Sequence, residues 1–467
     1  MLVKRFIIFF GFSIFFLLNL VSPPADLSEN SWLVASLLFL MSFWWISNAI
    51  PLSITALLPL IFIPALSDIS FKEVSTPYAN PIIFLLLGGF IIAQGLERSN
   101  LHKRVAIRIL LFLGSQRKDI LKGFIVSTAF LSMWLSNTAT CLLMLPIAVS
   151  ILEKMKIKDD SIFRKVLFIS IAYSASIGGM GTLIGTAPNA IFAGFLLENY
   201  EVELSFLDWM FFSIPLVFLL LLILWFYMNR VSYDTDVISG NNNIFVDEYH
   251  DLGSMTLKEK LSLIIISLTV FLWIFKSYIS DFINISLSDS NIAIFGAILF
   301  FILPTGKDGA ILKKDWFKSI PWNILILFGG GLSLASLVTS SGLASWLGES
   351  LFFLKDFHLF LIIILIALLI SFLTEVTSNT ATTLLFLPII IAFAVSNQLD
   401  FIILALPVVI AASCAFMMPI ATPPNAIIFS TNAIKISFMV SNGFKMNLVA
   451  ILISSLWIYF FSFILIS

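Results

Sequence analysis

The stretch SNTATCLLMLPI at residues 136–147 recurs as SNTATTLLFLPI at residues 378–389, and the two copies differ at only two of twelve positions. A second pair of blocks lies upstream of these motifs. The glycine pair at residues 88–89 matches the pair at residues 330–331, and both matches have the same offset of 242 residues. Two blocks in the same order and at the same offset indicate an internal repeat.

A third pair of blocks, downstream, contains prolines in an apolar setting. GTAPNAIF at residues 185–192 pairs with ATPPNAIIF at residues 421–429. Proline lacks the amide hydrogen and clashes with the preceding turn, so Pro188 and the pair 423–424 interrupt helical hydrogen bonding. At membrane depth, unwound backbone is tolerated only where it is buried or lines a cavity. We therefore expect two interrupted helices whose breaks meet the two Ser-Asn-Thr tips at one polar centre.

The composition places this repeat in a membrane. Of the 467 residues, 60% are hydrophobic and 11% are charged, against about 45–50% and about 25% in soluble domains. The formal net charge of -1 gives no support for nucleic-acid binding. Cys141 and Cys414 both lie in apolar segments, which argues against a disulfide framework or a metal cluster. The sequence predicts an all-α polytopic protein embedded in the lipid bilayer.

Eleven apolar stretches are candidate membrane crossings. Their centres lie near residues 14, 41, 58, 88, 180, 218, 268, 297, 330, 412 and 454. The stretches 124–151 and 359–396 have a Ser-Asn-Thr cluster at their middle, so we expect each to form a re-entrant hairpin. The apolar run after Lys4 and Arg5 lacks a small-x-small cleavage pattern and is interpreted as an uncleaved first span. The prediction is about eleven transmembrane helices plus two re-entrant hairpins.

The basic residues predict the orientation. If the N-terminus is cytoplasmic, all of the 26 Lys and Arg residues except Lys72, Lys276 and Lys355 fall in inner segments. Positive charge is enriched in cytoplasmic loops, so we expect a multi-pass protein of the cell (inner) membrane, with the N-terminus inside and the C-terminus outside. An odd number of crossings separates the two copies, so they are inverted repeats, which are typical of secondary transporters.

Five segments make up the predicted organisation. Residues 1–118 are scaffold helices ending in a cytoplasmic interfacial arm at 98–114, for which a plain basic loop is the alternative. Residues 119–230 are a first transport half with hairpin, broken helix and following span, and residues 231–257 are a cytoplasmic linker. Residues 258–355 are scaffold helices ending in an outer interfacial arm near 341–355, and residues 356–467 are a second transport half with hairpin, broken helix and last span.

The predicted polar centre carries almost no charge. The windows 127–140, 176–192, 371–383 and 413–431 contain no Lys, Arg or His, and Glu375 is their one charged residue. If Glu375 pointed at the site it would add a ligand for sodium or a proton, but we expect it to face the outer aqueous side. Helix N-termini suit carboxylates, and hydroxyl, amide and carbonyl oxygens suit small cations. A bound anion then needs a co-bound cation, for which sodium is the natural candidate. For one such motif alone, hydrogen bonding between helices is the simpler interpretation, but two symmetric copies favour a site.

These blocks, with the phrase GLERSNLHKRVA at residues 95–106, resemble the divalent anion/sodium symporter family, also called INDY-type transporters, from about residue 32 to the C-terminus. The resemblance implies a homodimer that imports a small di- or tricarboxylate of the succinate, malate, fumarate or citrate class with sodium. It also implies an elevator mechanism, in which a transport domain moves against a scaffold. Ala187 stands where proline is common in the family, so the first break is expected to differ from the second.

The resemblance also implies the roles of individual residues. Residues that contact or flank the substrate would be Ser136, Asn137, Thr138, Thr186, Ser378, Asn379, Thr380, Thr422 and Pro423. One sodium would lie near Ser132, Ser136, Asn137 and Gly185. The other would lie near Thr374, Ser378, Asn379 and Ala421. Sodium would act as the coupling ion, with no other cofactor.

Three alternatives stay open. A sodium-independent exchanger of the same fold would use basic residues in place of the cation, and the four windows contain none. A carrier of sulfate or another oxyanion would share the fold. A membrane-embedded enzyme would need an acidic pair, a zinc motif or a serine with a nearby base, and His102, His250 and His358 accompany no such motif. The protein is therefore not predicted to be an enzyme.

Overall fold

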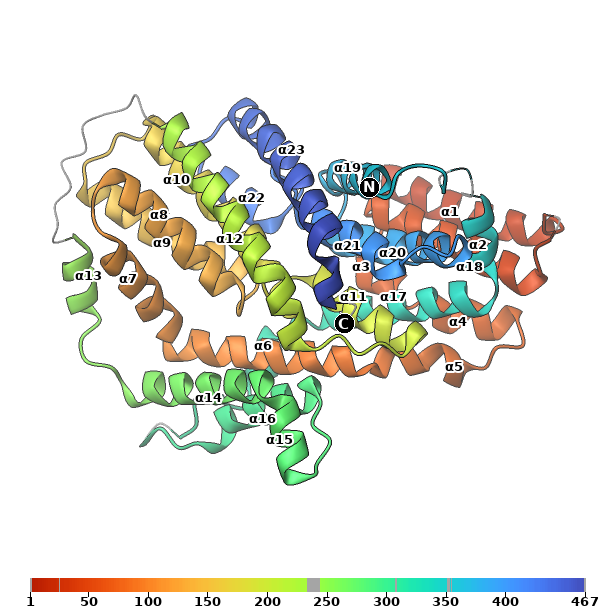
Figure 1. Ribbon diagram of the computed structural model, residues 1–467, viewed down its shortest axis with the longest axis horizontal. Helices are drawn as coiled ribbons and strands as arrows, with labels where there is room; N and C mark the ends of the chain where they lie inside the picture. Colours follow the sequence, from red (N-terminus) through yellow and green to blue (C-terminus); the bar gives the residue numbers. More distant parts are fainter. Residues whose placement is uncertain are drawn as a thin grey trace.

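The computed structural model describes residues 2–24, 26–232, 244–306, 309–350, 353 and 355–465. Within these ranges the chain is a bundle of α-helices (Figure 1), and the one β feature is an isolated bridge between Pro304 and Ala310. The predicted all-α membrane fold is confirmed. Residues 233–243 of the predicted linker lie outside the described residues.

The helices follow the two repeats. α1 (Leu2–Leu20) precedes the first, which comprises α2 (Glu29–Ser47), α3 (Leu52–Thr55), α4 (Leu58–Leu66), α5 (Phe71–Ser75), η1 (Thr76–Ala79), α6 (Pro81–Ser99), α7 (Leu101–Leu113), α8 (Arg117–Ser132), α9 (Asn137–Lys154), α10 (Ile162–Gly179), α11 (Ala187–Tyr200) and α12 (Phe206–Val231). After α13 (Ile244–Asp251), the second comprises α14 (Leu257–Ile274), α15 (Lys276–Ile283), α16 (Asp289–Ile302), η3 (Trp316–Ser319), α17 (Trp322–Ser340), α18 (Leu343–Ser350), α19 (Leu359–Thr374), α20 (Asn379–Ser396), α21 (Phe401–Ala412), α22 (Pro423–Phe429), α23 (Ile436–Phe461) and η5 (Ser462–Leu465).

The number of crossings depends on helix length. Among the described residues, nine helices are long and apolar enough to span a membrane, or ten if α14 and α15, bent by 78°, form one span. Two of the nine, α9 and α20, are the second arms of the predicted hairpins. The apolar helices at 52–66, 289–302 and 401–412 are shorter than the about 20 residues that a bilayer requires. The predicted number of eleven is therefore not confirmed.

Each Ser-Asn-Thr motif begins a helix after a short turn. The hydroxyl of Ser136 accepts a hydrogen bond of 3.2 Å from the backbone amide of Ala139, which caps α9. Ser378 occupies the same N-cap position before α20. Serine is favoured at such positions because its oxygen satisfies an otherwise unpaired amide of the first turn. Both predicted hairpins therefore form as helix–turn–helix units, α8–α9 and α19–α20.

The two predicted broken helices are α10–α11 and α21–α22. Proline lies in the first turn of both α11 and α22, where its missing amide hydrogen costs nothing. The breaks are unequal: the first spans residues 180–186, whereas the second spans residues 413–422 and leads into a helix of only 7 residues instead of 14. The two breaks therefore differ, as the alanine at position 187 suggested.

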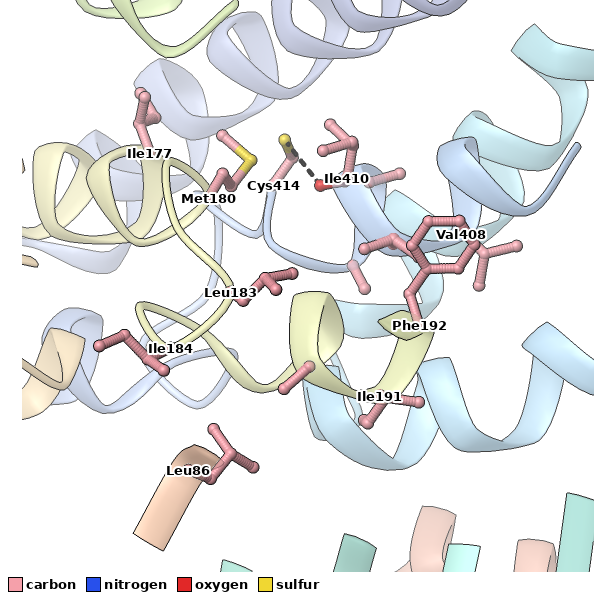
Figure 2. Packing of buried hydrophobic residues seen from close by; sticks show 14 of the residues in the cluster. Leu86, Ile177, Met180, Leu183, Ile184, Ile191, Phe192, Val408, Ile410 and Cys414 are labelled. Carbon is pink, nitrogen blue, oxygen red and sulfur yellow. Dashed lines mark hydrogen bonds between the residues drawn. The ribbon is translucent and has the colours of Figure 1, made fainter. Parts of the chain in front are cut away.

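The two repeats are packed across each other at these breaks. α11 of the first repeat lies against α20 and α21 of the second, and α22 of the second lies against α9 and α10 of the first. The sulfur of Cys141 on α9 lies 3.8 Å from the carbonyl oxygen of Pro424. Figure 2 shows part of the apolar core at the breaks, where Phe192 of α11 lies beside Val408 of α21 and Leu183 lies on the first break. Neither repeat alone encloses the polar centre.

The glycine pairs are positions of close helix packing. A Cβ atom on Gly88 of α6 would lie 2.7 Å from the carbonyl carbon of Ala293 on α16, and one on Gly330 of α17 would lie 2.6 Å from the carbonyl carbon of Ala56 and closer still to its oxygen. α6 therefore runs directly along α16, with α14 beside them at the lower edge of Figure 1. Both predicted arms contain helices, α7 and α18, although residues 351, 352 and 354 of the second arm are not described.

Candidate functional site

A cavity of about 600 Å³ lies where the two hairpin tips and the two breaks meet. All nine predicted substrate residues line it: Ser136, Asn137, Thr138, Thr186, Ser378, Asn379, Thr380, Thr422 and Pro423. Gly185 and Ala421, both predicted to lie near sodium, also line this cavity. Its described lining contains no Asp, Glu, Lys, Arg or His. An anion in the cavity would therefore meet hydroxyl groups, amides and helix N-termini, with no basic side chain.

The opposite wall of the cavity was missed by the sequence analysis. It consists of residues from α2, α6 and α17 and from the short connections beside them, including Trp45, Asn48, Phe90, Asn323 and Phe328. Asn48 adopts a left-handed conformation (φ 47°) as it ends α2, a conformation that asparagine tolerates better than most residues. An asparagine shortly before Pro51 was a local indication of a helix end, but nothing in the sequence indicated that it faces a cavity.

Behind the first tip, oxygen atoms gather around Ser132. Its hydroxyl oxygen lies 2.7 Å from Oδ1 of Asn137 and 2.7 Å from the carbonyl oxygen of Ala175. The backbone of Gly179 lies against the same group, since a Cβ there would be 2.5 Å from Oδ1 of Asn137 and 3.1 Å from the carbonyl oxygen of Gly185. Ser132 is fully buried. We call these five residues the first oxygen cluster.

The second tip repeats this arrangement. The hydroxyl oxygen of Thr374 lies 2.7 Å from Oδ1 of Asn379 and 3.2 Å from the carbonyl oxygen of Ala412. Thr374 follows Ser132 by the repeat offset of 242 residues and is also fully buried. These three residues form the second oxygen cluster. Ser136 and Ser378 lie at the N-caps instead, and the Ser136 hydroxyl is engaged by the α9 amide.

The two oxygen clusters have the chemistry of sites for a small hard cation. Neutral hydroxyl, amide and carbonyl oxygens are the donors that such cations prefer in proteins. No group of three or more His, Cys, Asp or Glu side chains that could hold a metal ion occurs among the described residues. Cys141 and Cys414 are free thiols.

Two asparagines that the sequence analysis did not single out hold the breaks open. The side-chain nitrogen of Asn189 donates to the carbonyl oxygens of Thr182 at 2.8 Å and of Gly179 and Met180 at 3.2 Å. Asn425, at the matching position, has the same role in the second break. Each asparagine replaces backbone hydrogen bonds that the break removes, which allows unwound chain to stay buried. The shared Pro-Asn pair of the third repeat block could have indicated this role.

Glu375 does not face the outer aqueous side as expected. Its side chain is buried with 3% exposed, and its two carboxylate oxygens each accept a 2.9 Å bond from an amide of the second break, those of Met417 and Met418. The side-chain amide of Asn447 on α23 donates a third bond of 2.7 Å. Burial of a carboxylate is tolerated when its oxygens are satisfied in this way. The first repeat has Met133 at the matching position, so only the second break is held by a charge.

Comparisons with known proteins agree with this architecture. Residues 2–467 match the family described as the sodium:sulfate symporter transmembrane region. The chain is 40% identical over 462 residues to the sodium-dependent dicarboxylate transporter SdcS of Staphylococcus saprophyticus, a match that covers 96% of this chain and 89% of that one. SdcS of Staphylococcus aureus matches with the same identity and coverage.

The fold resembles that of a solved transporter. The crystal structure of YdaH from Alcanivorax borkumensis superposes with a TM-score of 0.60 over 93% of this chain and 98% of that chain, at 12% sequence identity. At this identity the likeness concerns the fold alone. The match to the family along the whole chain and the 40% identity to SdcS go further: the chain belongs to the sodium:sulfate symporter family, the divalent anion/sodium symporters that its paired Ser-Asn-Thr motifs predicted.

Proposed function

We propose that this protein imports a small dicarboxylate coupled to sodium. The observation that carries the proposal is a cavity that both Ser-Asn-Thr tips line, that has no charged side chain in its described lining, and that is backed by two buried oxygen clusters. The names of the 40% identical relatives, sodium-dependent dicarboxylate transporters, favour a dicarboxylate over sulfate or citrate.

Each tip is suited to one end of a dianion. The first-turn amides of α9 and α20 point their N–H groups toward the cavity end of each helix, where a carboxylate is favoured by the helix dipole. The amides of Asn137 and Asn379 and the hydroxyls of Thr138 and Thr380 supply further donors. The Oδ1 atoms of Asn137 and Asn379 belong to the oxygen clusters. Each asparagine would therefore contact a cation on one side and a substrate carboxylate on the other. Sodium would thereby orient the groups that bind the substrate.

The wider mechanism is part of the same proposal. A transport domain of residues 119–230 and 356–467 would move as an elevator against a scaffold of residues 1–118 and 258–355, within a homodimer in the cell membrane. The lining of the cavity supports this division, since one wall comes from the hairpins and breaks and the other from α2, α6 and α17. The N-terminus would be cytoplasmic and the C-terminus outside.

Uptake into proteoliposomes tests the proposed substrate and coupling. Purified protein is assayed with succinate, citrate and sulfate, each with and without an inward sodium gradient. Sodium-driven uptake of succinate is the expected result. Uptake that needs internal carboxylate but no sodium would identify an exchanger, and sodium-driven uptake of sulfate alone would identify an oxyanion carrier. The absence of any uptake would reopen the possibility of an enzyme.

Replacing Asn379 by alanine is expected to weaken succinate binding. The change removes a hydrogen bond to a charged group, which is worth about 1.5–3 kcal/mol, or roughly 10–150-fold in affinity. Asn137→Ala at the matching tip should have a similar effect, and calorimetric titration with succinate in saturating sodium measures both. Thr140→Val is the control, since Thr140 is buried on α9, has no hydrogen-bond partner for its hydroxyl among the described residues and is absent from the cavity lining. Unchanged succinate affinity in Asn379→Ala would contradict the assignment.

Replacing Glu375 by glutamine is expected to raise the sodium concentration that half-saturates uptake by about tenfold. The substitution keeps the size of the side chain but presents an NH₂ group to the amides of Met417 or Met418, and a lost bond to a charged acceptor is worth about 1.5–3 kcal/mol. Met133→Leu at the matching position of the first repeat is the control. Sodium dependence equal to that of the unmodified protein would mean that the carboxylate does not position the second break.

A further inference from the structure

A second cavity, of about 550 Å³, lies between α12 and α23, which run alongside each other in the upper part of Figure 1. Its lining comes from the last turns of α12 and the first half of α23: Ile223, Phe226, Tyr227, Asn229, Arg230, Lys445, Met446 and Val449. None of these residues belongs to the candidate transport site. We call this cavity the α12–α23 cleft.

The cleft is polar at one end and apolar at the other. Arg230 lies at the end of α12, next to the segment that leads to α13, and Lys445 lies on α23 with its Nζ 5.9 Å from the centre of the Tyr227 ring. Ile223 and Phe226 lie one to two turns deeper along α12, and Val449 lies one turn deeper along α23. Phe226 is 58% exposed. The lining therefore matches an amphiphile with its head at the basic end.

The two cations have no acidic partner in the part of the chain that the structure describes. Neither Arg230 nor Lys445 forms an ion pair with a carboxylate within the described residues. Lys445 lies at the same end of the cleft as Arg230, and its ammonium contacts the face of the Tyr227 ring. A cation–π contact satisfies only part of the demand of a charged group, so an anion between the two side chains would stabilise both cations.

We propose that the α12–α23 cleft binds an anionic phospholipid. The head-group phosphate lies between Arg230 and Lys445, and an acyl chain lies along Phe226, Ile223 and Val449. A zwitterionic lipid offers the same phosphate but carries its own cation, so it competes poorly for two basic side chains. A soluble phosphate would satisfy the cations but would leave the apolar part of the cleft uncovered, and the extent of that part favours the lipid.

Native mass spectrometry of the delipidated full-length protein tests this proposal. Phosphatidylglycerol, phosphatidylcholine and inorganic phosphate are added in turn, and retained lipid is counted. Each basic side chain near a membrane surface contributes about fivefold in affinity for an anionic lipid. The double variant Arg230→Gln with Lys445→Gln should therefore retain phosphatidylglycerol roughly 25-fold less well. Arg108→Gln with Lys260→Gln, an exposed pair outside the cleft, is the matched control and should change retention less than twofold.

A second variant examines the acyl-chain part. Val449→Trp fills the apolar end and leaves both cations, so it should also lose phosphatidylglycerol. Equal retention of phosphatidylcholine and phosphatidylglycerol by the unmodified protein would overturn the proposal, as would unchanged retention in either cleft variant. Displacement of phosphatidylglycerol by an equal concentration of inorganic phosphate would assign the cleft to a soluble anion instead. These outcomes do not depend on which substrate the protein transports.

Discussion

Succinate binding is expected to disappear when sodium is replaced by choline, with affinity falling more than about 10⁴-fold. A cation about 5 Å from a carboxylate contributes roughly 3 kcal/mol at an effective dielectric near 20, and two such pairs, one at each tip, contribute roughly 6 kcal/mol. No Lys, Arg or His in the described lining can replace that attraction. The N-termini of α9 and α20 supply only about half a charge each, which does not balance two negative charges.

Calorimetry in sodium and in choline measures this effect directly. Because coupling between two ligands is reciprocal, succinate must raise the affinity for sodium by the same factor as sodium raises the affinity for succinate. Lithium and potassium at equal ionic strength are the controls for general screening. Equal succinate affinity in sodium and in choline would contradict sodium coupling and would indicate an exchanger or a proton-coupled carrier.

Gly179→Ala is expected to abolish transport, with a loss of at least about 1,000-fold. The added methyl group would lie 2.5 Å from Oδ1 of Asn137 and 3.1 Å from the carbonyl oxygen of Gly185, so it would occupy the space between the oxygens of the first cluster. Excluding one cation removes its attraction to the carboxylate at the first tip, roughly 3 kcal/mol by the same Coulomb estimate. Overpacking adds a cost of about 1–3 kcal/mol.

Ser174→Ala is the matched control for this glycine. Ser174 is fully buried on the same helix, α10, and its hydroxyl has no hydrogen-bond partner among the described residues, so its removal should leave uptake within about twofold. Size-exclusion profiles of both variants distinguish loss of transport from loss of folding. Gly179→Ala with normal folding and normal sodium-driven uptake would show that the first oxygen cluster holds no coupling cation.

The parts of the fold that could be predicted are those with local causes. Ser-Asn-Thr clusters in the middle of apolar stretches indicated the hairpins, and prolines that remove helical hydrogen bonds indicated the breaks, each from a few neighbouring residues. The repeat then placed both sets at one centre, because inverted copies face each other across a pseudo-two-fold axis. The residues that line the main cavity from the hairpins and breaks follow from these signals together with the family resemblance.

The residues that sequence analysis missed depend on contacts far along the chain. Asn323 faces the cavity because α17 packs beside α2 and α20, and no pattern around residue 323 encodes that neighbour. Glu375 was expected at the aqueous surface because an unpaired carboxylate is costly inside a protein. Its partners are the amides of Met417 and Met418 and the side chain of Asn447, which are 42 to 72 residues away. No sequence pattern near Glu375 indicates these partners.

The crossed packing of the repeats has a consequence for biosynthesis. α11 packs on α20 and α9 packs on α22. The first half of the chain is therefore synthesised before the helices that cover it exist. At about 5–20 residues per second, the residues between α11 and the end of α22 take roughly 10–50 s to synthesise. During that interval a hairpin and a broken helix with unsatisfied polar groups must stay in the bilayer. We expect this early half to be the preferred target of membrane chaperones and quality-control proteases, and truncated chains that end before residue 379 to be degraded rapidly.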